Sequence, residues 1–311
     1  METVKTIQIN RATDVVGSTK LRDYLQLTKP SLNIMVVFSS VIGYLLAPNV
    51  VAFDWKMILL FFIGGFLVTG SANAINQVVE RDTDALMKRT AMRPLAAGRM
   101  SVQEGWAFAI ITGLTGVSIL FFYFNALSAS LALVSLFLYS FIYTPLKKVA
   151  AIAVLVGALP GALPLLIGWA AGNDALFGAG NGWKDWGGWV LFLLQFLWQF
   201  PHFWAIAWVA HNDYSKAGFK LLPSKSGPTK FTALQTVIYA LLMIPVGLLP
   251  YFIGMSGIVS LVIVTIANLF LVFQCLRLYN ESNATAARRV MFSSYIYLPV
   301  VLLALLGDKV H

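Results

Sequence analysis

Three oxygen-bearing side chains recur at helical spacing in the first third of the chain: Asn76, Glu80 and Asp84. At 3.6 residues per turn these positions share one helix face, with a rise of about 6 Å from each to the next. Amide and carboxylate oxygens suit Mg²⁺, which also keeps phosphate oxygens and water as ligands. The spacing therefore predicts a magnesium site. The alternative is a solvated helix end held by salt bridges.

Basic residues follow this acidic face within ten positions: Lys88, Arg89 and Arg93. Arginine can hold phosphate oxygens through two parallel hydrogen bonds, and lysine binds phosphate as a point charge. A basic cluster beside metal-binding carboxylates indicates a polyanion bound through a cation bridge, and a diphosphate fits best. The alternative is that these cations only set membrane topology.

The elements that must position these residues are apolar. Of 311 residues, 59% are hydrophobic and only 11% are charged, against about 25% charged in ordinary globular domains. Apolar runs long enough to cross a bilayer, about 20 residues, occur at 31–48, 57–76, 102–122, 127–143, 150–170, 187–209, 232–252, 257–276 and 290–307. We therefore predict an all-α polytopic membrane bundle of about nine transmembrane helices around a central cavity. Residues 1–29 are expected to form a cytoplasmic N-terminal segment, and residues 30–311 the transmembrane domain.

Lysine and arginine residues concentrate on one side of this predicted bundle. Of the 22, all but Lys56, Lys184 and Lys309 fall before the first run or after the second, fourth, sixth and eighth. The positive-inside rule then predicts a cytoplasmic N-terminus and an external C-terminus in a bacterial plasma membrane. The matrix side of a mitochondrial membrane is the alternative. Because the basic residues are scattered between apolar spans, the net charge of +9 does not indicate nucleic-acid binding.

The run from Asn76 to Asp84, with Lys88-Arg89-Thr90 and Arg93-Pro94 after it, resembles the first signature of the UbiA superfamily of intramembrane prenyltransferases. The general pattern there is Asn-Asp-x-x-Asp-x-x-x-Asp, and Gln77 and Glu80 replace its first two aspartates. That variant is more similar to the protohaem IX farnesyltransferases than to the quinone-pathway members. Further matches extend the resemblance over about residues 25–310: Leu27-Thr28-Lys29-Pro30, Tyr143-Thr144-Pro145-Leu146-Lys147, Gly161-Ala162-Leu163-Pro164 and Trp198-Gln199-Phe200-Pro201-His202-Phe203-Trp204.

The resemblance implies farnesyl diphosphate and haem B as substrates, Mg²⁺ as cofactor, and contacts from Tyr143 and Lys147 to the diphosphate. It implies attack by a haem B vinyl group and then hydration, giving haem O. Membrane lipid and enzymes of the haem pathway are the expected partners. One alternative is another acceptor, such as an aromatic quinone precursor. A transporter of an anionic lipid or metabolite is a second, but broken helices and midplane charges would be expected of it, whereas the charges here cluster at one face.

A second polar cluster, Asn212-Asp213-Tyr214-Ser215-Lys216, follows the sixth apolar run. The corresponding signature of the superfamily is rich in aspartate, and only Asp213 remains a carboxylate here. We expect Asp213 to join Asn76, Glu80 and Asp84 in the catalytic metal site, and Tyr214 and Lys216 to bind substrate. An ordinary loop is the alternative.

Polar side chains also recur inside the sixth run: Gln195, Gln199 and His202. Polar groups within a bilayer usually face an internal cavity or another helix, so Gln199 and His202 are candidate substrate contacts. Three interpretations of His202 stay open: an axial haem ligand, a proton shuttle, or a packing residue.

Overall fold

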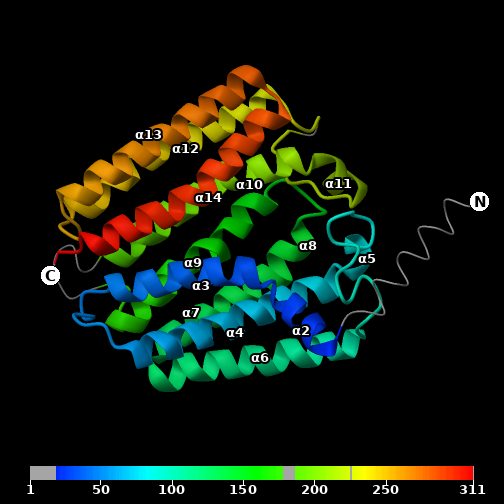
Figure 1. The fold of residues 1–311 in the computed structure, drawn as a ribbon, viewed down its shortest axis with the longest axis horizontal. Coiled ribbons are helices and arrows are strands. Elements are labelled where there is room, and N and C mark those ends of the chain that lie inside the picture. Colours follow the sequence, from blue (N-terminus) through cyan, green and yellow to red (C-terminus); the bar gives the residue numbers. More distant parts are fainter. Residues whose placement is uncertain (1–18, 178–185, 225, 311) are drawn as a thin grey trace, which may run out of the picture.

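The computed structural model describes residues 19–177, 186–224 and 226–310, which form an all-helical bundle (Figure 1). The part of the predicted N-terminal segment before residue 19, and the predicted far-side Lys184, lie outside the described residues. The helices are α2 Lys20–Thr28, α3 Pro30–Leu46, α4 Trp55–Val79, α5 Arg81–Asp84, α6 Val102–Tyr123, α7 Ala126–Phe137, η1 Leu138–Tyr143, α8 Thr144–Leu146, α9 Ala153–Asn173, α10 Gly187–Val209, α11 His211–Lys216, α12 Lys230–Phe252, α13 Ile258–Glu281 and α14 Ala284–Gly307.

The predicted spans are confirmed as helices. In the described ranges, eight helices are long and apolar enough to cross a membrane, and α2 with α3 forms a ninth candidate bent by 44°. The first apolar run is preceded by a helix, α2, that the polar composition before residue 30 did not suggest. Leu27 of α2 is fully buried, and Gln77 of α4 donates hydrogen bonds to the carbonyls of Gln26 and Leu27, at 3.2 and 2.9 Å. The end of α2 is therefore part of the bundle.

Close backbone contacts hold the centre of the bundle together. Helix α3 packs against α4, α9 and α14. A Cβ atom at Gly168 of α9 would overlap the carbonyl oxygen of Ser40 in α3, and one at Gly43 would overlap the carbonyl of Leu165. Small residues let membrane helices approach this closely, which gains van der Waals contact where no hydrophobic effect operates between helices.

A lysine that follows the last helix, α14, forms hydrogen bonds at the C-terminal end of α3. The Lys309 ammonium donates to the carbonyls of Leu45, Ala47 and Val50, at 2.8, 2.9 and 2.8 Å. Partial burial lowers the pKa of Lys309. Because the last carbonyls of a helix have no partner within it, this lysine caps the end of α3.

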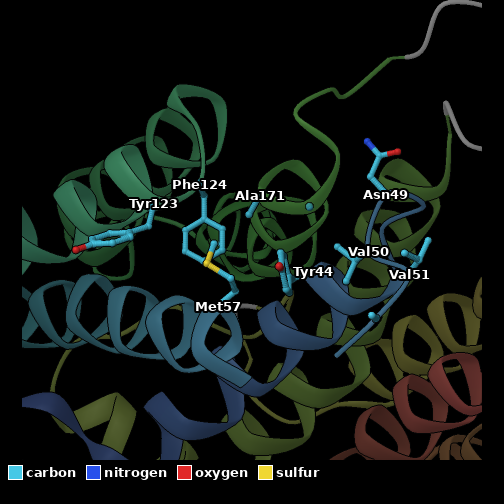
Figure 2. A pocket seen from close by; sticks show the side chains of 10 residues that line it. Tyr44, Asn49, Val50, Val51, Met57, Tyr123, Phe124 and Ala171 are labelled. Carbon is cyan, nitrogen blue, oxygen red and sulfur yellow. The ribbon is translucent and has the colours of Figure 1, made fainter. Parts of the chain in front are cut away.

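The short helices α5 and α11 lie at one end of the bundle, and the C-terminus lies at the other (Figure 1). A cavity of about 370 Å³ at the C-terminal end of α3 is lined by residues that include Tyr44, Met57, Tyr123 and Phe124 (Figure 2). A second cavity, about 350 Å³, lies between α13 and α14. Neither is lined by a residue of the predicted acidic face, so the central cavity expected from the sequence stays a prediction.

Candidate active site at one end of the bundle

The acidic face begins in α4 and continues through a break in the helix. Helix α4 ends at Val79, and Glu80 separates it from the short α5. The backbone nevertheless keeps its helical course, since Glu80 N–H donates to the Asn76 carbonyl and Asp84 N–H donates to the Glu80 carbonyl, at 2.9 and 2.7 Å. Asn76, Glu80 and Asp84 are 1%, 4% and 1% exposed. Their burial removes the interpretation as a solvated helix end.

Each oxygen-bearing side chain of this face meets a cation from another segment. The Lys29 ammonium donates to Asn76 Oδ1 at 2.8 Å. Arg93 Nη1 donates to both carboxylate oxygens of Asp84, at 2.8 and 2.7 Å, and the Lys147 ammonium contacts Glu80 Oε1. Buried charges are stable only when paired, and the structure brings together three basic side chains and the three oxygen-bearing side chains of the acidic face.

Burial and charge act against each other on the groups of this site. Burial raises the pKa of the Asp84 carboxyl, and the neighbouring Arg93 opposes that rise. Burial lowers the pKa of the Lys147 ammonium, and Glu80 opposes that fall. Burial therefore favours the neutral forms of Asp84 and Lys147, and the oppositely charged partners Arg93 and Glu80 favour the charged forms.

Lys29 is a site residue that the sequence analysis quoted only as part of a motif. It has φ 49° and ψ 66°, a left-handed conformation that is uncommon for a residue with a side chain. The hinge at Lys29 is held by α4, because Asn73 donates to the Thr28 carbonyl at 3.1 Å and Gln77 bonds the preceding turn. The sequence signal that could have identified it is a lysine directly before Pro30, at the start of the first apolar run.

Helix α7 leads into the site through a π-helical segment, η1, which carries Tyr139 and Tyr143. Their rings lie 5.5 Å apart, and the Lys147 ammonium lies 5.1 Å from the Tyr143 ring. Asn76 Nδ2 donates to the hydroxyl of Thr144 at 3.2 Å, directly after η1. Short π-helical segments occur frequently at functional sites. The segment after this one brings Lys147 to Glu80 of the acidic face, and the diphosphate contacts implied for Tyr143 and Lys147 stay predictions.

The second polar cluster is only partly brought to this face. The Tyr214 ring of α11 lies 5.8 Å from the Phe219 ring, which itself lies 5.1 Å from the Lys147 ammonium. Burial raises the pKa of Tyr214, and the charge of Arg89 opposes that rise. Within the described ranges no three His, Cys, Asp or Glu side chains gather around a single metal position. Ala210 interrupts the helix between α10 and α11 with nearly the same backbone angles as Glu80 has between α4 and α5. The roles of Asp213 and the exposed Lys216 stay predictions.

The polar stripe of α10 faces neighbouring helices. Gln199 Nε2 donates to the carbonyls of Ala158 and Gln195, at 3.0 and 3.2 Å, so its amide nitrogen already has partners. His202 Nδ1 lies 2.9 Å from Ser294 Oγ of α14, and its ring stacks on Trp198 at 4.5 Å. The three interpretations of His202 remain open at this point.

The donor set fits Mg²⁺. Asn76, Glu80 and Asp84 supply hard oxygen ligands but only two carboxylates. Mg²⁺ is commonly held by one or two carboxylates, with substrate phosphates and water completing its shell. The three side chains supply only part of a ligand shell, and a phosphate and water would supply the rest, so the site suits this ion.

Comparisons with known proteins show the family of this chain. Residues 36–296 match the UbiA prenyltransferase family. A protoheme IX farnesyltransferase of Cytophaga hutchinsonii is 47% identical over 94% of this chain and 100% of its own length, and that of Flavobacterium johnsoniae is 41% identical over 92% and 94%.

Solved structures share the fold. One described as digeranylgeranylglyceryl phosphate synthase has a TM-score of 0.75 and 23% identity, over 93% of this chain and 98% of that one. A UbiA homologue from Archaeoglobus fulgidus, solved with GPP and Mg²⁺, has a TM-score of 0.65 and 16% identity, over 91% and 99%. With the family match, the two close relatives and its helical spans, this multi-pass membrane protein belongs to the UbiA prenyltransferase family.

Proposed function

We propose that this protein transfers the farnesyl group of farnesyl diphosphate to a vinyl group of haem B. One observation carries this proposal. The chain is 47% identical to a relative named as a protoheme IX farnesyltransferase, over 94% of this chain and 100% of that relative. The buried face of paired cations and carboxylates supports it independently, because that chemistry suits a diphosphate leaving group.

The diphosphate would bind at the end of α4. Lys29 would turn from the Asn76 amide oxygen, and Arg93 and Lys147 from their carboxylates, to the phosphate oxygens. Tyr143 would add a phenolic donor. Arginine and lysine bonds to phosphate are charge-assisted and therefore strong. Lys88, exposed in the same loop as Arg93, would contribute at the rim.

Asn76, Glu80 and Asp84 would hold Mg²⁺ against that diphosphate. When bound, the ion would neutralise charge on the departing diphosphate. Once they have turned to the bound diphosphate, Lys29, Arg93 and Lys147 would stabilise the same developing charge from the protein side.

The loop after α11 would limit the entry of water. Lys220 N–H donates to the Lys147 carbonyl at 2.7 Å, and the Phe219 ring lies 5.1 Å from the Lys147 ammonium. A dry site matters because an allylic cation formed from the farnesyl group would otherwise react with water.

The proposed reaction balances without an oxidant or reductant. The farnesyl carbon–oxygen bond breaks, and the diphosphate leaves with the bonding electrons. A haem vinyl group supplies the electrons of the new carbon–carbon bond. The resulting cation next to the porphyrin takes up water and loses a proton, which gives the hydroxyethylfarnesyl group.

We place the site at the cytoplasmic face of a bacterial plasma membrane. The support is the concentration of basic residues at the connections around α5 and α11 and the bacterial origin of the relatives.

The direct test is a product assay. Purified protein in detergent or nanodiscs would be incubated with haem B, farnesyl diphosphate and Mg²⁺, and the haem fraction analysed by mass spectrometry. We expect a haem heavier by one farnesyl group and one hydroxyl group, formed together with inorganic diphosphate. Farnesylation of an aromatic quinone precursor with haem B left unchanged would assign a different acceptor.

A further inference from the structure

We propose that Thr144 is a positioning residue of the metal site, whose hydroxyl holds the Asn76 amide with its oxygen directed toward the bound ion. This inference rests on the proposed function, because it adds a residue to the metal site described there. Thr144 lies directly after η1. The sequence alone gave it no role beyond its place in the motif from Tyr143 to Lys147.

The Asn76 amide has a partner at each end. Its oxygen accepts a hydrogen bond from the Lys29 ammonium at 2.8 Å, and its nitrogen donates to Thr144 Oγ1 at 3.2 Å. An ammonium can only donate, so the oxygen must be the atom that faces Lys29. Among the described residues, Thr144 is the only partner of the amide nitrogen. These two partners therefore determine which way the amide points.

The Thr144 hydroxyl is itself oriented by the π-helical turn of η1. Thr144 N–H donates to the Tyr139 carbonyl, five residues earlier, and the Thr144 hydroxyl donates to the same carbonyl at 2.9 Å. In an α-helix the N–H would bond the carbonyl four residues earlier, so the wider turn brings both donors to Tyr139. Because the hydroxyl proton is used there, Thr144 Oγ1 presents a lone pair to Asn76.

Burial makes this hydrogen bond consequential. Asn76 is 1% exposed and Thr144 is 2% exposed, so bulk water does not readily replace a lost partner. Without the Thr144 hydroxyl the amide nitrogen would be buried and unsatisfied, which is costly. The amide would then rotate away from its present direction to find another acceptor.

The bond to Thr144 matters most when diphosphate is bound. In the proposed function Lys29 turns from Asn76 to the phosphate oxygens, which frees the amide oxygen for the ion. Lys29 then no longer orients the amide, and the bond from the nitrogen to Thr144 is what keeps the oxygen in place. A hard cation such as Mg²⁺ takes oxygen ligands, so an amide turned the other way would offer it no ligand.

The test measures the affinity of the purified protein for Mn²⁺, in the presence of inorganic diphosphate and without haem. Thr144→Val keeps the shape of the side chain and removes its hydroxyl. We expect it to weaken Mn²⁺ binding about tenfold, at the lower end of what the loss of a group that orients a metal ligand costs. Thr144→Ser keeps the hydroxyl and should bind Mn²⁺ within about twofold of wild type.

A double-mutant cycle separates positioning from a general structural role. Asn76→Ala should weaken Mn²⁺ binding at least as much as Thr144→Val does. Adding Thr144→Val to Asn76→Ala should weaken it by less than about twofold more, because no amide is left to position. If Thr144 only stabilises the helix, the loss should be the same in both backgrounds.

Thr112→Val is the matched control, because it removes a threonine hydroxyl that donates to the Phe108 carbonyl within α6, at 2.8 Å. It should bind Mn²⁺ as wild type does. Thr144→Ala removes the same hydroxyl without a new methyl group, and it replaces Thr144→Val if that variant does not fold.

Wild-type Mn²⁺ affinity in either Thr144→Val or Asn76→Ala would overturn the inference. So would an equal loss in both backgrounds of the cycle, or a Thr144→Ser variant as weak as Thr144→Val. Failure of wild type to farnesylate haem B would count against the proposed function alone, because Mn²⁺ binding is measured without haem.

Discussion

The paired charges of the acidic face predict that a divalent cation and a diphosphate bind cooperatively. A metal ion that binds alone must take Glu80 from Lys147 and Asp84 from Arg93, and both cations then lose their partners. A diphosphate supplies new partners for these cations. Each ligand should therefore bind weakly by itself and tightly in the presence of the other.

The size of this coupling follows from the more buried pair. Isolating one member of a buried ion pair costs about 3–5 kcal/mol. The Arg93 side chain is 21% exposed, whereas the side chains of Lys147 and Glu80 are 9% and 5% exposed. We therefore count only the Lys147–Glu80 pair, at the lower limit. About 3 kcal/mol corresponds to a change in affinity of roughly 100-fold.

The assay would follow Mn²⁺, which shares the oxygen preference of Mg²⁺, by the EPR signal of the free ion. Titrations with and without inorganic diphosphate, corrected for the complex that forms in solution, give the coupling. Linkage requires the metal to improve diphosphate binding by the same factor, which calorimetry can check independently.

Lys147→Met removes the ammonium that competes with the metal ion for Glu80. Mn²⁺ alone should then bind more tightly, and the factor by which diphosphate improves Mn²⁺ binding should fall below about tenfold. Lys148→Met, at the neighbouring exposed position, is the matched control and should couple as wild type does. Identical Mn²⁺ affinity in wild type with and without diphosphate, or undiminished coupling in Lys147→Met, would refute the reasoning.

Other measurements test separate parts of the structure. Asp84→Asn should abolish turnover without loss of membrane insertion, and normal Mg²⁺ dependence at high turnover would remove Asp84 from the metal site. His202→Ala should lower haem affinity more than farnesyl diphosphate affinity and shift the Soret band of bound haem; unchanged spectrum and turnover would leave a packing residue. Reporter fusions should place the two chain ends on opposite sides, and a shared side would rule out nine spans. Lys309→Met, which removes three charged hydrogen bonds at a partly buried site, should cost about 2 kcal/mol and lower the melting temperature in detergent; an equal fall in Lys56→Met, at an exposed site, would contradict that role.

The helices and the acidic face could be predicted from the sequence because both depend on local spacing. A run of apolar residues marks a span wherever it lies, and four-residue intervals put Asn76, Glu80 and Asp84 on one face of a helix. The partners of that face depend on tertiary packing. Lys29 precedes Asn76 by 47 residues, and no periodic pattern indicates that these two side chains meet.

The partners of Gln77 and Gln199 could not be predicted from the sequence either. Their side chains are as polar as those of the acidic face, yet their amide nitrogens bond to backbone carbonyls that packing brings within reach. The sequence shows that such groups need partners in a membrane. Only the fold shows whether a partner is protein or substrate.

The cap that Lys309 places on α3 has a consequence for biogenesis. The carbonyls of Leu45, Ala47 and Val50 emerge from the ribosome early, and their lysine follows more than 250 residues later. Until then the end of the first long helix must be solvated by water or lipid headgroups. The first span can therefore insert early, but the bonds that tie its end to the C-terminal segment form only after translation is almost complete. A nascent chain arrested before residue 309 should expose this end of α3 to water-soluble labelling reagents from which the finished protein shields it.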